Sequence, residues 1–303
     1  MALLLSASAC FRIRTSPLSF PSALLPLFIA RSRKHQPRLS QVLARPIHRV
    51  SKRRRVDRLP ACPVNHLNKM EPNHIYQYSL LNALMDGVSE TGISVAKLTR
   101  KGNQGLGTFA RMNGELLFLD GVVYQLLAEG NVRVADASDQ IPFAVSTQFA
   151  PQKTQAVELG DKTAIDTALD DFNDHAVNLF MTYRIDGHFE YLKCRTVRGQ
   201  EYKGQPLSEL GKKQSVEEYR DVDGTIIGFR TPKNWQGFGV AGEHLHFIRA
   251  DRGAGGHVLE VRAKAVEMQM AVASNVHVEL PTSEDFNAAK LLTDDAGVKE
   301  VEG

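Results

Sequence analysis

Three histidines flank a glycine-rich turn in the C-terminal part of the chain. His244 and His246 are two residues apart, so in a β-strand both side chains project from one face while Leu245 projects from the other. Residues 251–256 have the composition of a hairpin turn, which would return His257 to a position beside this pair. Three neutral imidazoles with an open fourth position suit a catalytic zinc ion, whereas structural zinc sites usually contain cysteines. The pattern therefore favours a metal site over unrelated surface or core histidines.

The composition narrows the class of protein. The chain has 303 residues, enough for one large domain or two of ordinary size, and 43% hydrophobic residues are ample for a packed core. No apolar run reaches the length of a membrane span, so no membrane partner is expected. Cys10, Cys62 and Cys194 are too few and too scattered for a disulfide framework or a cysteine-type zinc site. A reducing compartment is therefore expected.

The net charge of +3 combines two unlike segments. Residues 1–69 contain fourteen Lys or Arg and a single acid, Asp57, whereas the rest of the chain carries a net charge of −10. A basic leader that is poor in acids is typical of an organelle transit peptide. A secretory signal fits less well, because its charged region should precede its apolar stretch. Residues 52–55 also match a basic nuclear-localisation or nucleic-acid patch.

Globular patterning starts abruptly at Met70, which allows another interpretation of the leader. Residues 1–69 could be an upstream extension of the true start. In either case we expect them to be disordered and exclude them from the fold prediction. The expected location is cytoplasmic, or mitochondrial if the basic leader is real.

From Met70 onward the chain is predicted to be α/β, of the α+β type. We expect an N-terminal α/β domain over residues 70–207, a strand-rich metal-binding domain over residues 208–286, and a polar, acidic tail over residues 287–303. Both domains should contain mixed or antiparallel sheets, with the metal site near their junction.

Individual elements follow from hydrophobic spacing and turn residues. Helices are predicted at residues 79–88 and 161–172, and a meander of strands over residues 105–127. A long hairpin is predicted over residues 178–197, with its turn at Asp186 and Gly187. Residues 208–218 are polar without clear periodicity and are interpreted as a connector. Four further strands are predicted, at residues 224–230, 244–249, 257–265 and 276–280.

Two charged residues stand out in the first predicted domain. Glu115 follows a turn and begins a strongly apolar strand, where a carboxylate could face a cavity or simply lie exposed at the strand edge. Arg195 shares a strand face with Lys193, opposite Cys194, so one face of that strand is basic. Such a face is either solvated or a site for an anion.

Short motifs spread over residues 75–286 resemble the α-acetolactate decarboxylase family. They lie, in family order, at residues 77–79, 82–85, 105–108, 114–115, 142–145, 193–197, 200, 212–214, 224–225, 227–229, 231–232 and 242–259. The resemblance covers nearly everything after the leader, and the number and order of the motifs make it specific.

This resemblance implies a zinc-dependent carboxy-lyase that converts 2-acetolactate to acetoin. Zinc would be held by the residues that match the family's histidines, with a glutamate and an arginine facing the metal, a threonine close by and a further glutamate from the C-terminal tail. These residues are His244, His246 and His257; Glu115 and Arg195; Thr108; and Glu300 or Glu302. Family members generally associate, so a homodimer is expected.

The chemistry of this substrate fits such a site. Acetolactate is a β-keto acid, and the electrons left by loss of carbon dioxide must move into the neighbouring ketone. No phosphate-binding or thiamine motif offers an organic electron sink, whereas zinc can act as the Lewis acid. Arg195 can pair with the substrate carboxylate, and Glu115 can donate a proton to the resulting enediolate.

Two other classes of function share some of these features. A zinc hydrolase could use the same three histidines but needs no carboxylate-binding arginine. A non-enzymatic, metal-stabilised module is the second alternative, because the scaffold around the histidines resembles small α/β domains that include DNA-binding members. The charge of −10 after residue 69 argues against nucleic acid as a partner.

Overall fold

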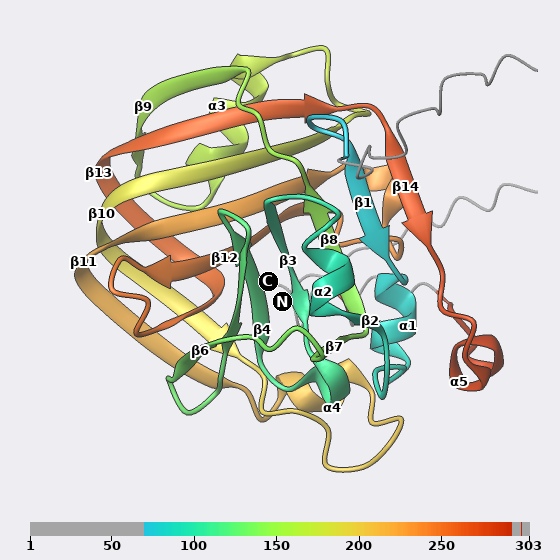
Figure 1. Ribbon diagram of the computed structural model, residues 1–303. Helices are drawn as coiled ribbons and strands as arrows, with labels where there is room; N and C mark the ends of the chain where they lie inside the picture. The colour runs from blue at the N-terminus through green and yellow to red at the C-terminus, as the bar shows by residue number, and fades with distance from the viewer. Residues whose placement is uncertain (1–69, 293–297, 299–303) are drawn as a thin grey trace, which may run out of the picture. The chain divides into compact units, whose positions relative to one another are not determined.

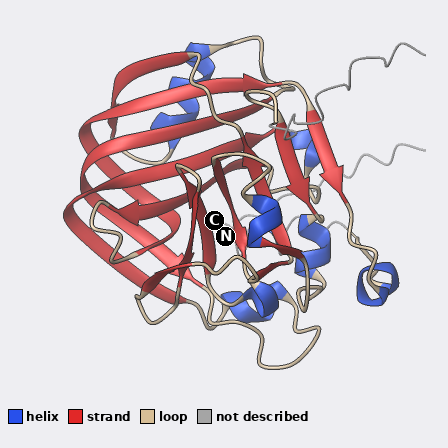
Figure 2. Ribbon diagram, in the orientation of Figure 1, coloured by secondary structure: helices blue, strands red, loops and turns tan. Residues whose placement is uncertain are grey.

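The computed structural model describes residues 70–292 and residue 298. The interpretations of residues 1–69, and of Glu300 and Glu302 as metal ligands, lie outside these residues. Strands are the main regular structure of the described chain and the helices are short (Figure 2). The prediction of a mixed α/β fold with antiparallel and mixed sheets is confirmed. Within the described part of the chain, no helix has the length and apolar character needed to cross a membrane.

The first sheet has seven strands in the order β14-β1-β8-β3-β4-β5-β6. Neighbours run antiparallel except β1 and β14, which are parallel. The strands are β1 (Ile75–Tyr78), β3 (Gln104–Thr108), β4 (Glu115–Leu119), β5 (Val122–Leu126), β6 (Val132–Val134), β8 (Phe143–Thr147) and β14 (Val276–Glu279). The predicted meander is confirmed as β3, β4 and β5. A separate pair joins β2 (Ile93–Ser94) and β7 (Gln140–Ile141).

The second sheet has five antiparallel strands in the order β10-β11-β12-β13-β9. Because β10 also pairs with β13, the strands β10 to β13 close into a ring, whose long curved strands are visible in Figure 1. The strands are β9 (Lys153–Leu159), β10 (Phe180–Thr196), β11 (Ser215–Thr231), β12 (Gly242–Arg249) and β13 (Gly255–Ala273). All four strands predicted after residue 219 are present, and β11 and β13 extend well beyond the predicted bounds.

Short helices complete the described chain. They are α1 (Leu81–Met85), α2 (Val95–Leu98), α3 (Thr163–Phe172), α4 (Leu207–Gly211) and α5 (Glu284–Ala288), with 3-10 turns η1 (Ala110–Met112) and η2 (Lys233–Trp235). The amphipathic helix α3 buries Ile165 and Leu169 in the core of the five-stranded sheet, which confirms the helix predicted at residues 161–172. The other predicted helix, at residues 79–88, is shorter than expected and survives only as α1.

The two sheets pack face to face, and β4 illustrates how the sequence produces this arrangement. All five of its residues are buried, as expected for a strand covered on both sides. Leu117 packs with Ile227 of the five-stranded sheet, whereas Leu116 packs on the opposite side in a cluster with Leu98 of α2. Because side chains alternate along a strand, Glu115 lies on the same face as Leu117, toward the five-stranded sheet.

The predicted turn at Asp186 and Gly187 is wrong. Both residues lie inside the continuous strand β10 and pair with β11 on one side and β13 on the other. Asp186 accepts hydrogen bonds from Arg184 and Thr225, so its side chain ties neighbouring strands together and closes no turn. Gly187 allows a close approach, because a Cβ there would lie 2.9 Å from Cγ1 of Val266.

The interpretation of residues 208–218 as a connector is also wrong. Residues up to 211 belong to α4, whose Leu210 is buried, and β11 begins at Ser215. The alternating exposure at the start of β11 reflects a strand with one face in water, which weakens the apolar signal in the sequence. Strands from both sides of residue 207 share the five-stranded sheet, and β14 joins the seven-stranded sheet. The division into two domains at that residue stays a prediction.

The packing between the sheets predicts a large effect of truncating Leu117. Leu117→Ala should lower the free energy of unfolding by about 2–5 kcal/mol, because it opens a cavity in the core between the sheets. The matched control is Val134→Ala on β6, whose side chain is 61% exposed and should matter by about 0.5 kcal/mol or less. Urea unfolding measures both values. Equal, small effects in the two variants would contradict the assignment of Leu117 to this core.

Candidate metal centre

Alternation along β12 separates the histidines from the packing residues. Leu245 and Phe247 lie in the core cluster of the five-stranded sheet, whereas Ile248 lies in the cluster between the two sheets. His244 and His246 share the face of Ile248, so both side chains enter the layer between the sheets. This confirms the face assignment that the sequence predicted.

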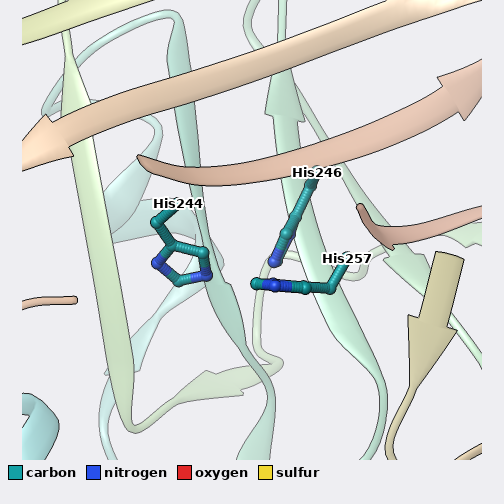
Figure 3. Close-up of side chains that lie close together, drawn as sticks. All are labelled: His244, His246 and His257. Atoms are coloured by element: carbon teal, nitrogen blue, oxygen red, sulfur yellow. The ribbon is translucent and has the colours of Figure 1, made fainter. Parts of the chain in front are cut away.

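The hairpin brings the third histidine to the same place. His257 on β13 pairs with His246 of β12, and its other neighbour across the strands is Arg195 of β10. One ligand atom of each histidine lies within 4.8 Å of the others, and the ring centroids are 5.1–5.4 Å apart. Figure 3 shows the rings of His244, His246 and His257 converging on a common point. The predicted grouping of the three histidines is confirmed.

Two glycines allow β13 to return so closely. A Cβ on Gly255 would lie 2.2 Å from the carbonyl oxygen of Phe247, and one on Gly256 would lie 2.8 Å from that of Arg195. Any side chain at these positions would push the strands apart. The glycines therefore determine where His257 lies, as well as marking the turn.

The environment of the histidines favours neutral imidazoles that can bind a metal. His246 Nδ1 donates a hydrogen bond to the carbonyl of Leu116 at 2.8 Å, which places its proton on Nδ1 and leaves Nε2 as the ligand atom. Burial and the nearby Arg195 lower the pKa of His244 to about 3, and the same causes hold that of His257 well below its ordinary value. The donor set therefore fits a divalent cation that accepts nitrogen ligands.

Glu115 and Arg195 form a buried ion pair beside the histidines. Arg195 Nη1 donates to Glu115 Oε1 at 3.0 Å, and Glu115 Oε2 lies 3.6 Å from His246 Nε2. Glu115 is only 5% exposed and Arg195 only 3%, so the exposed-edge and solvated-face interpretations of these residues are wrong. Lys193, which shares the strand face of Arg195, instead lies near the surface and pairs with Glu260. A buried ion pair adds little net stability to a fold, so its presence beside the histidines indicates a functional role.

A small cavity opens onto these polar groups. Its polar lining consists of Thr108, Glu115, Arg195 and His244. Thr108 pairs with Glu115 across β3 and β4, and its hydroxyl donates to the carbonyl of Gly114 at 2.8 Å. The structure therefore brings together all six predicted site residues that it describes. Their individual roles stay predictions.

The sequence analysis missed the apolar side of the cavity. It consists of hydrophobic side chains from α1, β8, η1 and α4, together with one residue that follows β10: Leu81, Leu84, Phe143, Met112, Leu207 and Val197. Hydrophobic spacing predicted a helix at residues 79–88, but no local pattern indicated which surface its apolar side chains cover. Such an apolar wall together with a few convergent polar groups is typical of small-molecule sites.

Glu243 is a second residue that the sequence analysis missed. It precedes His244 but lies on the opposite face of β12, where burial raises its pKa to about 7. Its carboxylate accepts a hydrogen bond from Arg230 Nε at 2.6 Å, and Arg230 also pairs with Asp166 and Asp170 of α3. Glu243 and Leu245 are two residues apart and therefore share a face of the strand. The apolar Leu245 was thus the available signal that this acid enters the core.

Comparisons with known proteins agree with this site. Residues 75–293 match the family model described as alpha-acetolactate decarboxylase. The chain is 39% identical to an alpha-acetolactate decarboxylase of Methanosarcina mazei over 72% of this chain and 75% of that protein, and 38% identical to one of Raoultella terrigena over 75% and 89%. The crystal structure of alpha-acetolactate decarboxylase from Bacillus subtilis strain 168 superposes with a TM-score of 0.73 at 33% identity, covering 76% of this chain and 99% of that one. The chain therefore belongs to the α-acetolactate decarboxylase family.

Proposed function

We propose that this protein catalyses the zinc-dependent decarboxylation of 2-acetolactate to acetoin. Family membership supports the reaction, and one observation of the site carries the mechanism. A buried arginine and a buried glutamate are paired at 3.0 Å within reach of three clustered histidines, at the polar side of an apolar cavity. These groups together meet the needs of a β-keto acid that loses carbon dioxide and gains a proton.

His244, His246 and His257 would hold the zinc ion. Three nitrogen ligands leave an open position, as in catalytic zinc sites. Bound there, zinc would supply Lewis acidity toward the ketone and hydroxyl oxygens of the substrate. The hydrogen bond from His246 to the carbonyl of Leu116 keeps that ligand in the required tautomer and orientation.

Arg195 would bind and orient the departing carboxylate. Its planar guanidinium carries five N–H donors, so one side chain can serve both Glu115 and a substrate carboxylate. Arg195 is only 3% exposed, so its pairing with the carboxylate would occur away from water, where a charge-assisted hydrogen bond is strong. As the carbon–carbon bond breaks, its electron pair moves toward the ketone and carbon dioxide leaves.

Glu115, in its protonated form, would then supply the proton that completes acetoin, and solvent would return a proton to it before the next turnover. Glu115 faces the histidines from the seven-stranded sheet, while Arg195 faces them from the five-stranded sheet. A donor fixed on one side of the enediolate delivers its proton to one face of the carbon, so a single acetoin enantiomer is expected. Thr108, on the neighbouring strand, would position Glu115 through the paired backbone.

The overall proposal has a direct test. Purified protein should convert 2-acetolactate to acetoin at neutral pH, and a zinc chelator should abolish the conversion above the spontaneous rate. Added zinc should restore it. An active enzyme that is indifferent to chelation, with no bound metal, would contradict the zinc dependence while leaving the reaction in place.

Replacing one histidine should separate metal binding from folding. The variants His244→Ala, His246→Ala and His257→Ala should each weaken zinc binding strongly. Loss of the hydrogen-bond partner of a ligand costs about 10- to 100-fold in metal affinity, and loss of the ligand itself should cost more. The fold should persist, because the strands are held by their own cores. His188→Ala, at a half-exposed histidine on β10, is the matched control and should bind zinc normally. Zinc titration followed by competition with a chelator gives the affinities, and full occupancy in all three site variants would refute the assignment.

Arg195→Lys should impair turnover without removing zinc. The substitution keeps the positive charge but loses the planar fork, so kcat/KM should fall about 10- to 1000-fold, equivalent to about 1.4–4 kcal/mol of transition-state stabilisation. Arg184→Lys is the control on the same strand, where the arginine pairs with Asp120 and Asp186 instead. Steady-state kinetics with metal analysis decides the matter. Wild-type kinetics in Arg195→Lys would mean that another group holds the carboxylate.

Glu115→Gln should damage the protonation step in particular. Glutamine keeps the size of the side chain but donates no acidic proton, so turnover should fall by about 100- to 10,000-fold. Protonation by water need not respect one face, so the enantiomeric purity of acetoin should also fall. Glu243→Gln, at a buried carboxylate on the opposite face of β12, should leave the purity unchanged. Chiral analysis, corrected for spontaneous decarboxylation, provides the measurement, and unchanged rate and purity in Glu115→Gln would exclude the role.

A further inference from the structure

Gln200 makes hydrogen bonds to three separate segments around the cavity. Its side-chain oxygen accepts from Ser89 Oγ at 2.6 Å, and its side-chain nitrogen donates to the carbonyls of Gly87 and Gln205, at 2.8 Å each. Its backbone N–H donates to the carbonyl of Arg111 at 2.7 Å, and Arg111 Nη2 donates to the Gln200 carbonyl at 2.9 Å. Gln200 is 7% exposed, so these bonds form in a low-dielectric setting where they are strong.

Each of these segments carries part of the apolar wall. Gly87 closely follows α1, which supplies Leu84, and Gln205 closely precedes α4, which supplies Leu207. The third segment contains Arg111, and Met112 follows it directly. The three hydrophobic side chains line the cavity and belong to one core cluster. One glutamine therefore connects the chain segments that hold the apolar wall of the cavity that Glu115, Arg195 and His244 also line.

The segment at residues 111–112 depends on outside support. Arg111 and Met112 have φ values of 59° and 53°, in the left-handed region that costs free energy for residues other than glycine. Such a conformation persists only where its surroundings fix it. Gln200 bonds Arg111 through both its carbonyl and its guanidinium, and the Arg111 N–H donates to the carbonyl of Ser89 at 2.7 Å. The position of Met112 therefore depends on this network.

We propose that Gln200 is a positioning residue that sets how far the apolar wall stands from Glu115 and Arg195, and so limits the alkyl group that a substrate can carry at the reacting carbon. This inference rests on the proposed function. The proposed substrate carries a methyl group there, and its ethyl homologue, 2-aceto-2-hydroxybutyrate, carries one more methylene. An apolar wall at fixed distance distinguishes two such substrates, because one methylene in a fitted pocket changes kcat/KM by about 10- to 200-fold. A wall that can move loses part of that distinction.

The test compares both substrates in Gln200→Met. Methionine has a similar length but cannot replace the hydrogen bonds. The KM for acetolactate should rise about tenfold, and the ratio of kcat/KM for acetolactate to that for the ethyl homologue should fall by about threefold or more. The zinc affinity should stay unchanged, because the bonds of Gln200 lead to segments other than β12 and β13. Loss of general stability would lower both kcat/KM values together and leave their ratio intact.

Two further variants complete the test. Gln104→Met removes another buried glutamine, which donates to Thr182 Oγ1 and the Tyr183 carbonyl at the other end of β10 from Arg195, and should leave the ratio unchanged. Ser89→Ala removes a single bond to Gln200 and should shift the ratio in the same direction by less, which also serves if Gln200→Met does not fold.

An unchanged ratio in the Gln200 and Ser89 variants, or an equal shift in Gln104→Met, would overturn the inference. A wild-type enzyme inactive on both acids would instead refute the proposed function, and the inference with it. These results are distinguishable, because only the first requires an active wild-type enzyme.

Discussion

The packing of two sheets face to face is the constraint on which the site depends. Thr108 and Glu115 enter the layer between the sheets from one side, and Arg195 and His246 enter it from the other. Polar groups buried in such a layer must find partners there, because they have lost water. The bond from His246 to the carbonyl of Leu116 and the bond from Arg195 to Glu115 both cross the layer. The same contacts that satisfy these groups also hold the sheets in one alignment.

The parts of the site differ in how firmly they are held. The histidines stand on strands that close into a ring, where His246 and His257 have strand partners on both sides. Much of the apolar wall comes from short helices and turns, which side-chain hydrogen bonds of Gln200 connect. In the proposed function, the metal ligands thus lie on the rigid element, and the side chains that fit the alkyl group lie on the adjustable one.

Local sequence patterns predicted the histidine cluster because its geometry is local: an alternating pair, a turn and a return strand. The burial of Glu115 was not predictable in this way, since its cover comes from Arg195, eighty residues away in sequence. Asp186 and Gly187 are residue types that favour turns, but β11 and β13 pair with them on both sides and hold them in a strand. The local sequence gives no information on either partner strand. The family resemblance identified Glu115 and Arg195 because it rests on many distant motifs at once, whereas the position of the apolar wall required the fold.

The contact between His246 and residue 116 has a consequence for how this family can change. The acceptor is a main-chain carbonyl, so replacing Leu116 by another apolar residue that fits its core cluster leaves the bond in place. Insertion or deletion of one residue in β4 acts differently, because a slip of one position turns every side chain of the strand to the opposite face. Such a change would move the carboxylate of Glu115 out of the layer between the sheets and shift the carbonyl away from the imidazole at the same time. Natural variation in this strand should therefore consist of substitutions, with changes in length confined to the turns at its ends.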